Sequence, residues 1–387
     1  MSEWKKVKLG EISQTIQTGP FGSQLHQSDY SVIGIPVVMP KDIIAGNIEE
    51  ASIARVEQHH IDRLSRHMIS YGDILYARRG DVGKCAFTKQ NQEGWLCGTG
   101  CLRVTINPDM ANPKFVFFQL QKQETIGWIT NHAIGSTMLN LNTTILSNAP
   151  VEIPSLRIQN RIVEILSRYD SLIENYQKQI KLLEEAAQRL YKEWFIDLRF
   201  PGHENTKIVD GVPEGWTPSQ LGQLAEFKRG KTITKKDVID GNIPVVAGGL
   251  EPAYSCNKSN TAERVITISG SGANAGFTRM YFEKVWASDC SFVDVSVTPF
   301  LHFVYCYLKD NKTTIDNMQK GAAQPHVYAK DINSLGLCIP IESILKSFEG
   351  KISKYFDSIS SLQSQLRLLT EARNRLLPKL MSGEIEI

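Results

Sequence analysis

The sequence predicts an α+β chain: two similar α/β domains, joined and spaced by two long antiparallel helices, in a pseudo-two-fold internal repeat. Three observations lead to this prediction. Two long segments carry apolar stripes at helical spacing, these segments align on each other, and a domain-sized block with strand-like runs precedes each of them.

The first long segment has apolar or aromatic side chains every three or four positions from Ile158 to Trp194. This spacing is one face of a helix and is close to a heptad pattern. Between Ser155 and Arg199 the sequence has no Gly or Pro. At about 1.5 Å per residue, a helix over this stripe is roughly 55 Å long.

A second stripe runs from Ile344 to Leu380, and Pro378 is expected to end its helix. Two equal stripes favour burial of one helix against the other, as an antiparallel pair. The alternative is that each helix packs only on its own block. The four-residue step from Tyr176 to Ile180 breaks the alternation, so the seam is expected to loosen or unwind there.

The chain is an internal duplication. Residues 135–200 align without gaps on residues 321–386, and upstream Ile35–Val38 parallels Ile243–Val246. The expected boundaries are a first domain at 1–154, a helix at 155–200, a linker at 201–212, a second domain at 213–340, and a second helix with the tail at 341–387.

Each block reads as mixed α/β with more strand than helix, because short β-branched and aromatic runs are bounded by Gly, Pro and Asp. The strand-like runs are Val32–Met39, Gly72–Ala77, Leu102–Ile106, Arg264–Ser269 and Ser291–Val297. Pro113 and Pro299 are expected to open short helices at Lys114–Gln123 and Phe300–Lys309.

Composition excludes several classes of protein. The chain has 387 residues, of which 42% are hydrophobic and 22% charged, as in ordinary globular proteins. It has no apolar run long enough to cross a membrane and no leader-like start, so we expect a cytoplasmic protein with no membrane partner. Its seven cysteines have no paired spacing and read as reduced thiols. A net charge of +2 means that any basic surface is local.

The sequence carries no recognisable catalytic motif and no metal-ligand spacing, so we predict no catalytic residue and no metal site. Asn112-Pro113-Lys114-Phe115 is similar to the Asn-Pro-Pro-aromatic motif of amino-methyltransferases but lacks the second Pro. Its repeat mate is Thr298-Pro-Phe-Leu, and an N-cap followed by Pro at the first helical position explains both copies, so we expect no methylation site here.

Loops at equivalent places in both blocks carry side chains suited to DNA, although a basic hairpin is also an ordinary solvated turn. Arg forks onto guanine edges or phosphates, amides and hydroxyls read bases, and Gly allows close approach of the backbone. The candidate DNA-binding residues are Arg78, Arg79, Gly80, Lys84, Ser136, Thr137 and Asn140 in the first block, and Lys228, Arg229, Lys231, Ser271, Asn274, Arg279, Gln324 and His326 in the second.

The whole chain resembles the DNA-specificity subunit of type I restriction–modification systems. The order block–helix–block–helix carries the resemblance, together with Leu190–Gly202 after the first helix and Leu376–Ile385 at the end. Ile153-Pro154 with Gln159 and Ile162 is similar to the family's entry into the central helix. The second copy departs from it, with Leu345 and Phe348 at the last two positions.

The resemblance implies that each block is a target-recognition domain reading one half of a bipartite, asymmetric site in double-stranded DNA. It implies that the helices set the spacing and dock two methyltransferase subunits, and that restriction subunits join this complex. It implies no cofactor in this chain, with S-adenosylmethionine, ATP and Mg²⁺ on the partner subunits. Docking is expected on the outward face of the first helix, at Lys178, Lys181, Glu184, Glu185 and Gln188.

Two other classes of function stay open from the sequence. A coiled-coil scaffold for protein partners alone also needs two long helices, and only the salt dependence of binding separates it from a DNA-binding protein. A self-contained methyltransferase needs its own site for S-adenosylmethionine.

Overall fold

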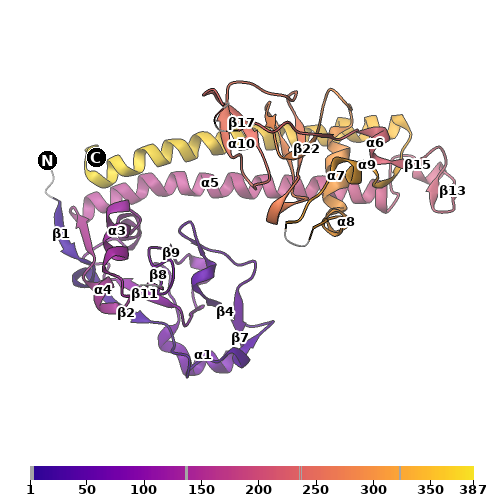
Figure 1. Cartoon of the computed structure of the whole chain (residues 1–387). Helices are drawn as coiled ribbons and strands as arrows, with labels where there is room; N and C mark the ends of the chain where they lie inside the picture. The colour runs from indigo at the N-terminus through magenta and orange to yellow at the C-terminus, as the bar shows by residue number, and fades with distance from the viewer. Residues whose placement is uncertain (1–3, 136–137, 235, 237, 322–323) are drawn as a thin grey trace. The chain divides into compact units, whose positions relative to one another are not determined.

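The computed structural model describes residues 4–135, 138–234, 236, 238–321 and 324–387. The chain forms two compact units: unit 1 comprises residues 1–173 and 368–387, and unit 2 comprises residues 174–367. Each unit contains one mixed α/β domain and one segment of each long helix, α5 (Leu156–Tyr191) and α10 (Glu342–Ser382) (Figure 1).

The domain of unit 1 is built on two four-stranded sheets, ordered β2-β11-β8-β9 and β10-β4-β7-β3, with β1 paired to β12 and β5 to β6. Its strands are β1 (Lys5–Lys8), β2 (Ser13–Thr18), β3 (Tyr30–Ser31), β4 (Ile35–Val38), β5 (Ile43–Ile44), β6 (Asn47–Ile48), β7 (Ala54–Val56), β8 (Ile74–Ala77), β9 (Cys85–Phe87), β10 (Leu96–Cys97), β11 (Cys101–Ile106) and β12 (Pro150–Ile153). Its helices are α1 (Gln58–Leu64), α2 (Pro113–Leu120), α3 (Gln123–His132) and α4 (Thr143–Ser147).

The domain of unit 2 has a four-stranded sheet, β16-β22-β19-β20, and a three-stranded sheet, β18-β17-β21, with β15 paired to β23 and β13 to β14. Its strands are β13 (Ile208–Val209), β14 (Val212–Pro213), β15 (Thr217–Gln220), β16 (Lys228–Arg229), β17 (Ile243–Val246), β18 (Tyr254–Cys256), β19 (Val265–Ser269), β20 (Thr278–Tyr281), β21 (Trp286–Ala287), β22 (Cys290–Asp294) and β23 (Gly336–Ile339). Its helices are α6 (Leu221–Leu224), α7 (Leu301–Asp310), α8 (Lys312–Asn317) and α9 (Ala329–Asn333).

The two domains repeat one topology. The order β2-β11-β8-β9 in unit 1 becomes β16-β22-β19-β20 in unit 2, and all neighbours in both sheets are antiparallel. In the second sheets, β4 pairs parallel with β10 and antiparallel with β7, as β17 does with β21 and β18. Unit 1 adds β3 at the edge of this sheet. The structure thus confirms the internal repeat.

Burial explains why these runs become strands. Every residue of β8 and of β19 is buried, since each strand is central in its sheet and is covered on both faces. The helix after β11 begins as expected, with Asn112 as N-cap and Pro113 at the first position, whereas the helix after β22 begins only at Leu301, with Phe300 and not Thr298 at the N-cap. Asn112 Oδ1 accepts hydrogen bonds from the N–H groups of Lys114 (2.9 Å) and Phe115 (3.2 Å), and Thr298 Oγ1 accepts one from the N–H of Phe300 (3.3 Å).

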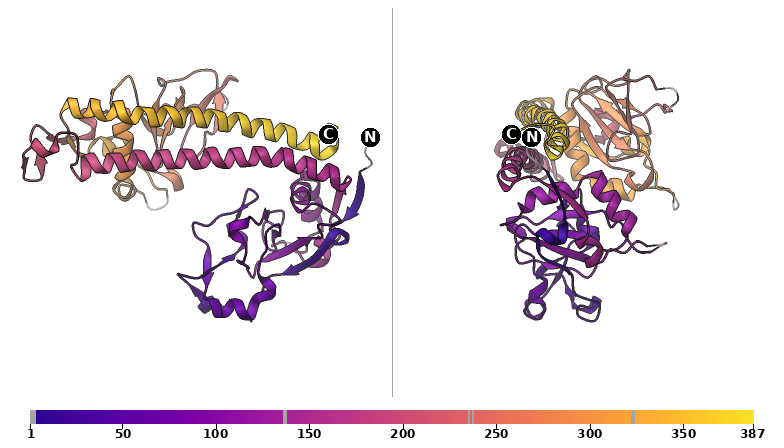
Figure 2. Two further views of the ribbon diagram at one scale, coloured as in Figure 1. Left: turned by 180° about the vertical axis from the view of Figure 1, so that it is seen from behind. Right: turned by 90° about the vertical axis from the view of Figure 1, so that its left-hand side faces the viewer.

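In unit 1 the start of α5 lies beside the end of α10, and the two segments run antiparallel (Figure 2). Ile162 and Leu166 of α5 pack in one core with Leu380 of α10. Further along, Asp170 Oδ1 accepts from Arg373 Nε at 3.1 Å across the seam. The apolar stripe and one partly buried ion pair therefore hold the helices together in this unit.

In unit 2 the end of α5 lies beside the start of α10, again antiparallel (Figure 2). Trp194 and Phe195 stand against Phe348 of α10, with ring centroids 5.6 and 4.8 Å apart. The repeat makes Phe356 and Ala187 the equivalents of Asp170 and Arg373, and both lie in the apolar core of this unit. The antiparallel pairing and the mutual burial of the stripes are confirmed in each unit.

Three details of the prediction were wrong. Helix α10 continues through Pro378 to Ser382, because Leu380 and Met381 are buried in the core of unit 1 and hold the last turn in place. Helix α5 remains regular through Tyr176 and Ile180, and the irregular turn is instead a π-helix at Lys192–Ile196. The predicted strand at Val32–Met39 begins only at Ile35, because residues 32–34 turn from β3 into β4.

Candidate nucleic-acid interface

The candidate interface of unit 1 is a cluster of four neighbouring segments, residues 19–22, 78–84, 98–100, and 134–142 without 136–137. The loop after β8 and the loop before α4 are joined by their backbones. The Leu141 N–H donates to the Arg78 carbonyl (2.8 Å), and the Gly80 N–H donates to the Leu139 carbonyl (3.1 Å). Asn140 closes its own loop by a reciprocal pair of backbone hydrogen bonds with Ile134 (2.8 and 3.0 Å). We call this set of segments the first loop cluster.

The other two segments are fixed beside these loops. The Arg78 N–H donates to the Gly100 carbonyl (2.8 Å), and the Gly19 N–H donates to the Cys101 carbonyl (2.9 Å). A Cβ on Gly19 would lie 1.9 Å from the Gly98 oxygen, so only glycine permits this approach. Gly135 has φ +121°, a conformation that a side chain would strain.

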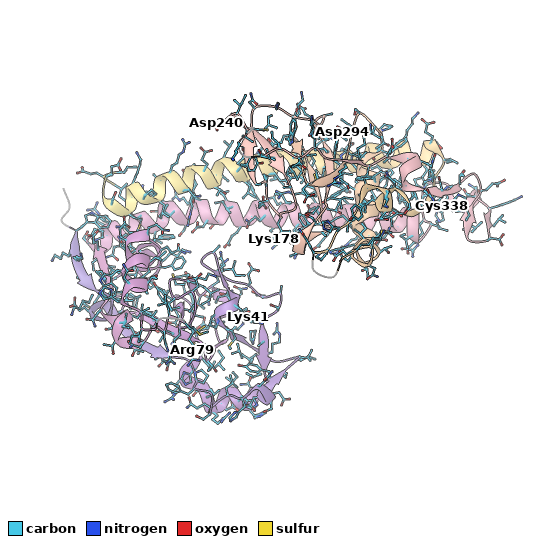
Figure 3. All side chains as sticks on the ribbon, viewed as in Figure 1. Lys41, Arg79, Lys178, Asp240, Asp294 and Cys338 are labelled. Atoms are coloured by element: carbon cyan, nitrogen blue, oxygen red, sulfur yellow. The ribbon has the colours of Figure 1, made fainter. Side chains whose placement is uncertain are left out.

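The side chains of the first loop cluster differ in exposure. Arg79 is exposed (Figure 3), whereas Arg78 and Asn140 are half-buried. The Arg78 guanidinium stands over the ring of Phe21, 5.8 Å from its centroid. Lys84 sits at the other end of its hairpin and pairs with Asp81 at 3.2 Å. The structure thus brings Arg78, Arg79, Gly80 and Asn140 together, while Ser136 and Thr137 lie outside the described residues.

Unit 2 builds the second loop cluster from residues 230–232, 270–276, 288–290, and 320–327 without 322–323. The Val327 N–H donates to the Gly270 carbonyl (3.1 Å), the Gly272 N–H donates to the Pro325 carbonyl (3.0 Å), and His326 exchanges backbone hydrogen bonds with Lys320 (2.8 and 2.9 Å). These bonds place Ser271 where unit 1 has Arg79, and His326 where unit 1 has Asn140.

The remaining connections of the second loop cluster repeat as well. The Gly270 N–H donates to the Asp289 carbonyl (3.1 Å), and the Gly230 N–H donates to the Cys290 carbonyl (2.8 Å). Gly321, with φ +101°, takes the place of Gly135. The two clusters therefore share one backbone scaffold and present different side chains from it.

The second loop cluster is less basic at its centre. The Ser271 hydroxyl donates to the Asp289 carboxylate, and the His326 ring stacks on Tyr328 with 6.0 Å between centroids. Lys231 follows Gly230 directly and is exposed.

The other predicted residues of unit 2 surround this centre. Gln324 is exposed and adjoins Gly321, while Asn274 ends a short 3-10 turn, Gly272–Asn274, in the loop after β19. Lys228 and Arg229 are exposed on β16, the strand that leads into Gly230.

Arg279 is the predicted residue that lies apart from the loops. It belongs to β20, where its guanidinium donates to the Leu250 carbonyl (2.9 Å), pairs with Glu251 (2.9 Å) and stacks on Tyr281 (4.9 Å). It lines a cavity of about 630 Å³ between β20 and the long helices of unit 2. Its guanidinium is thus engaged by Leu250, Glu251 and Tyr281 inside unit 2.

Three residues in or directly beside these clusters were not predicted from the sequence. Phe21 lies in the run Gly19-Pro20-Phe21-Gly22, which carries no motif that marks the ring as exposed. Asp289 and Tyr328 carry no motif, and only folding brings them next to Ser271 and His326.

The expected docking face of α5 also needs a correction. Lys178 is exposed (Figure 3), but Gln188 donates from Nε2 to the Cys306 carbonyl (3.4 Å) and so faces the domain of unit 2. Glu184 is half-buried in the same cavity as Arg279, and desolvation raises its pKa. The helix period turns both residues toward the domain of unit 2, Gln188 toward α7 and Glu184 toward β20.

Among the described residues, no three His, Cys, Asp or Glu side chains are grouped as metal ligands, and no helix is long and apolar enough to span a membrane. All seven cysteines are free thiols. Burial raises the pKa of Cys85, Cys97 and Cys290 to about 12.

Two like domains, each presenting one polar loop cluster and each packed on the same pair of helices, define a recognition protein with two modules. Residues 1–185 and 213–371 match the family Type I restriction modification DNA specificity domain, once for each half of the chain. The chain belongs to this family and is a specificity subunit, which is the non-catalytic component of a type I restriction–modification system. Recognition of a DNA sequence is the role of such subunits.

Relatives cover the whole chain. The chain is 26% identical over 414 residues to the type I restriction enzyme MjaIX specificity subunit of Methanocaldococcus jannaschii, covering 100% of this chain and 94% of that protein. It is 21% identical over 473 residues to the HindI specificity subunit of Haemophilus influenzae, covering both chains fully. Its fold is similar to the crystal structure of the type I S subunit from M. genitalium, with a TM-score of 0.65, 17% identity, and coverage of 98% of this chain and 96% of that one. The predicted fold class is confirmed.

Proposed function

We propose that each unit reads one half of a bipartite, asymmetric site in double-stranded DNA, with its loop cluster as the reading surface. The observation that carries this proposal is the repetition of one backbone scaffold with different side chains at equivalent positions. Arg79 and Asn140 in unit 1 correspond to Ser271 and His326 in unit 2. A scaffold that is kept while its exposed side chains change is suited to reading two different sequences.

The chemistry of these side chains matches base edges. Arg donates two hydrogen bonds to guanine O6 and N7, and Asn exchanges two with adenine N6 and N7. Ser and His each offer one donor or acceptor to several bases, so unit 2 reads its half-site with different contacts. Lys228, Arg229 and Lys231 are then positioned for phosphates, which fix the register of the protein on the duplex.

We further propose that α5 and α10 set the distance between the half-sites and dock two methyltransferase subunits. Helix α5 has 36 residues and therefore a length of roughly 54 Å, comparable with the 34–36 Å of about one turn of B-DNA plus the width of a groove. Every residue of α5 between Leu166 and Ala187 is at least partly exposed, and Leu172 and Leu182 are 43% and 53% exposed. Such apolar exposure on a long helix supports docking of a partner protein.

Catalysis then belongs to the partners. We propose that the methyltransferase subunits carry S-adenosylmethionine, that restriction subunits joining the complex use ATP and Mg²⁺, and that this chain contributes no cofactor. A DNA target and reduced thiols are consistent with assembly in the cytoplasm.

The test uses the full chain assembled with its methyltransferase subunits. The methylated motif of the host genome is first read by modification-sensitive sequencing, and duplexes altered in one half-site are then compared by gel retardation. Arg79→Ala is expected to weaken binding by ~1–3 kcal/mol, and to abolish discrimination in one half-site while sparing the other. Arg157→Ala removes an exposed arginine from α5 of the same unit and serves as the matched control.

Two results would contradict the proposal. One is equal retardation of the specific and scrambled duplexes at physiological salt. The other is a change of specificity in both half-sites when residues 1–150 are exchanged for those of a relative. Binding that is insensitive to added salt would favour the scaffold function, since phosphate contacts release counterions and weaken steeply with salt.

A further inference from the structure

Phe21 is an apolar ring held in the open on a polar surface. Its side chain is 54% exposed, although its neighbours in the first loop cluster are arginines, an amide and glycines. Scattered exposed leucines need no explanation, but a phenylalanine fixed in the middle of a recognition surface does.

The loop that carries Phe21 is closed by contacts at both of its ends. Gly19 is held against Gly98 at one end. Gln24 closes the other end: its Oε1 accepts from the Phe21 N–H at 3.0 Å, and its own N–H donates to the Phe21 carbonyl at 2.8 Å. The ring is therefore presented from a closed turn, in which neither end of the loop is free to carry it into the core.

Arg78 fixes the ring from one side. Its guanidinium stands 5.8 Å from the ring centroid, while its backbone is bonded to Gly100 and Leu141 at the centre of the cluster. The Arg78 Nε is buried and has no hydrogen-bond partner among the described residues. Phe21 and Arg78 thus form one pair in which a cation and an apolar surface lie side by side.

Unit 2 lacks this pair. Gly230 takes the place of Gly19, so that Lys231 and Thr232 stand where unit 1 has Pro20 and Phe21. Gly270 stands where unit 1 has Arg78. The feature is therefore specific to the half-site that unit 1 reads.

An exposed ring gains free energy when it is buried against another apolar surface. In the major groove, the apolar group that the base edges offer is the C5-methyl of thymine, whereas the rims of the groove are phosphates. A wedge between base pairs would require unstacking, and Arg78 already covers part of one ring face. An Arg beside a ring suits a methyl-bearing pyrimidine next to a guanine, since Arg forks onto guanine O6 and N7.

We propose that Phe21 is a specificity-determining residue that packs on the C5-methyl group of a thymine in the half-site read by unit 1, with Arg78 held over its ring. This inference rests on the proposed function, and it adds the chemical group that is recognised. Phe21 contributes discrimination between thymine and uracil.

The experiment replaces each thymine of the first half-site in turn by deoxyuridine, which removes only the methyl group. The complex of the full chain with its methyltransferase subunits is titrated with these duplexes. One position is expected to weaken wild-type binding about fourfold, the change that corresponds to burial of one methyl group. Phe21→Ala is expected to bind the two duplexes equally, and Phe21→Leu to retain part of the difference.

Tyr71→Ala is the control, because Tyr71 is another exposed aromatic residue of unit 1 and lies in the turn that precedes β8. It is expected to keep the full response to the methyl group. Circular dichroism and the unchanged reading of the second half-site show that the Phe21 variants are folded.

Several outcomes overturn the inference. They are a first half-site without thymine, a wild-type complex indifferent to every deoxyuridine, or a Phe21→Ala complex that keeps the difference. The inference also fails if 2-aminopurine fluorescence reports unstacked bases with the wild type but not with Phe21→Ala. That result would mean that the ring inserts between base pairs and does not pack on a methyl group. In each case Arg79→Ala still reports on the first half-site, so failure of this inference is distinguishable from failure of the proposed function.

Discussion

Replacement of Phe348 by alanine is expected to destabilise unit 2 selectively. Phe348 of α10 is 0% exposed and sits where the ends of the two helices meet the domain. Its ring lies 4.8 Å from Phe195, 5.6 Å from Trp194 and 6.2 Å from Phe303, measured between centroids. The side chain therefore joins α5, α10 and α7 in one aromatic core.

The magnitude follows from burial and from these ring pairs. Truncation of a fully buried phenylalanine costs about 3–5 kcal/mol. Aromatic pairs contribute about 0.5–1.5 kcal/mol each beyond the area they bury, so the upper part of this range is expected. Because a domain has about 5–15 kcal/mol of stability in total, the loss is about a quarter of it or more.

The assay is a urea titration followed by hydrogen exchange and mass spectrometry, which reads peptides of the two units separately. The two units have separate apolar cores, one around Phe348 and one around Leu166. Exchange is therefore expected to rise in unit 2 at lower urea, while the domain of unit 1 keeps its midpoint. Leu182→Ala, at a 53% exposed leucine of α5 in unit 2, is the matched control and should change stability by less than about 0.5 kcal/mol.

A loss below about 1 kcal/mol for Phe348→Ala would refute the reasoning from burial. An equal shift in both domains would refute the existence of two separate cores.

Three further predictions concern other parts of the chain. Arg373→Gln breaks the ion pair with Asp170. Both side chains of this pair are about a quarter exposed, so the loss of stability in unit 1 should be only about 1 kcal/mol. A loss above about 3 kcal/mol in urea denaturation would contradict this. At pH 8, iodoacetamide should label Cys338 before Cys97. Cys338 is partly exposed, whereas burial raises the pKa of Cys97 to about 12 and leaves little reactive thiolate. Peptide mass spectrometry that finds the reverse order of labelling would disprove this prediction. Gly321→Ala should impair reading of the second half-site alone, since φ is +101° and the new Cβ would lie 2.6 Å from the Gln324 oxygen, and unchanged retardation would refute it.

The architecture was predictable because it follows from the helical spacing of apolar residues and from the internal duplication of the sequence. The stripe from Ile158 to Trp194 and its copy from Ile344 predicted two helices that pack on each other. This prediction depends only on the spacing of apolar residues and not on the conformation of any loop. The predicted end of the second helix at Pro378 was wrong. Proline disfavours a helix interior, but burial of the turn that follows Pro378 outweighs the lost backbone hydrogen bond.

The interface was predictable only as a set of loops. Arg79 and Arg279 both follow strand-like runs near glycines, and sequence alone does not separate them. Strand register does: Arg279 pairs with Thr267 inside the sheet and meets Glu251, while Arg79 lies beyond the end of β8. Phe21 was missed because its importance comes from Arg78, a residue distant in sequence.

The loop clusters are built almost entirely by backbone hydrogen bonds, and this has a consequence for how the protein changes over generations. Such bonds require glycine at positions such as Gly135 and Gly321, but they require no particular residue at Arg79 or His326. Substitutions at these outward positions cost the fold little, because surface changes are usually within about ±0.5 kcal/mol. A lineage can therefore acquire a new target through single substitutions in one unit, while the other unit keeps its old one.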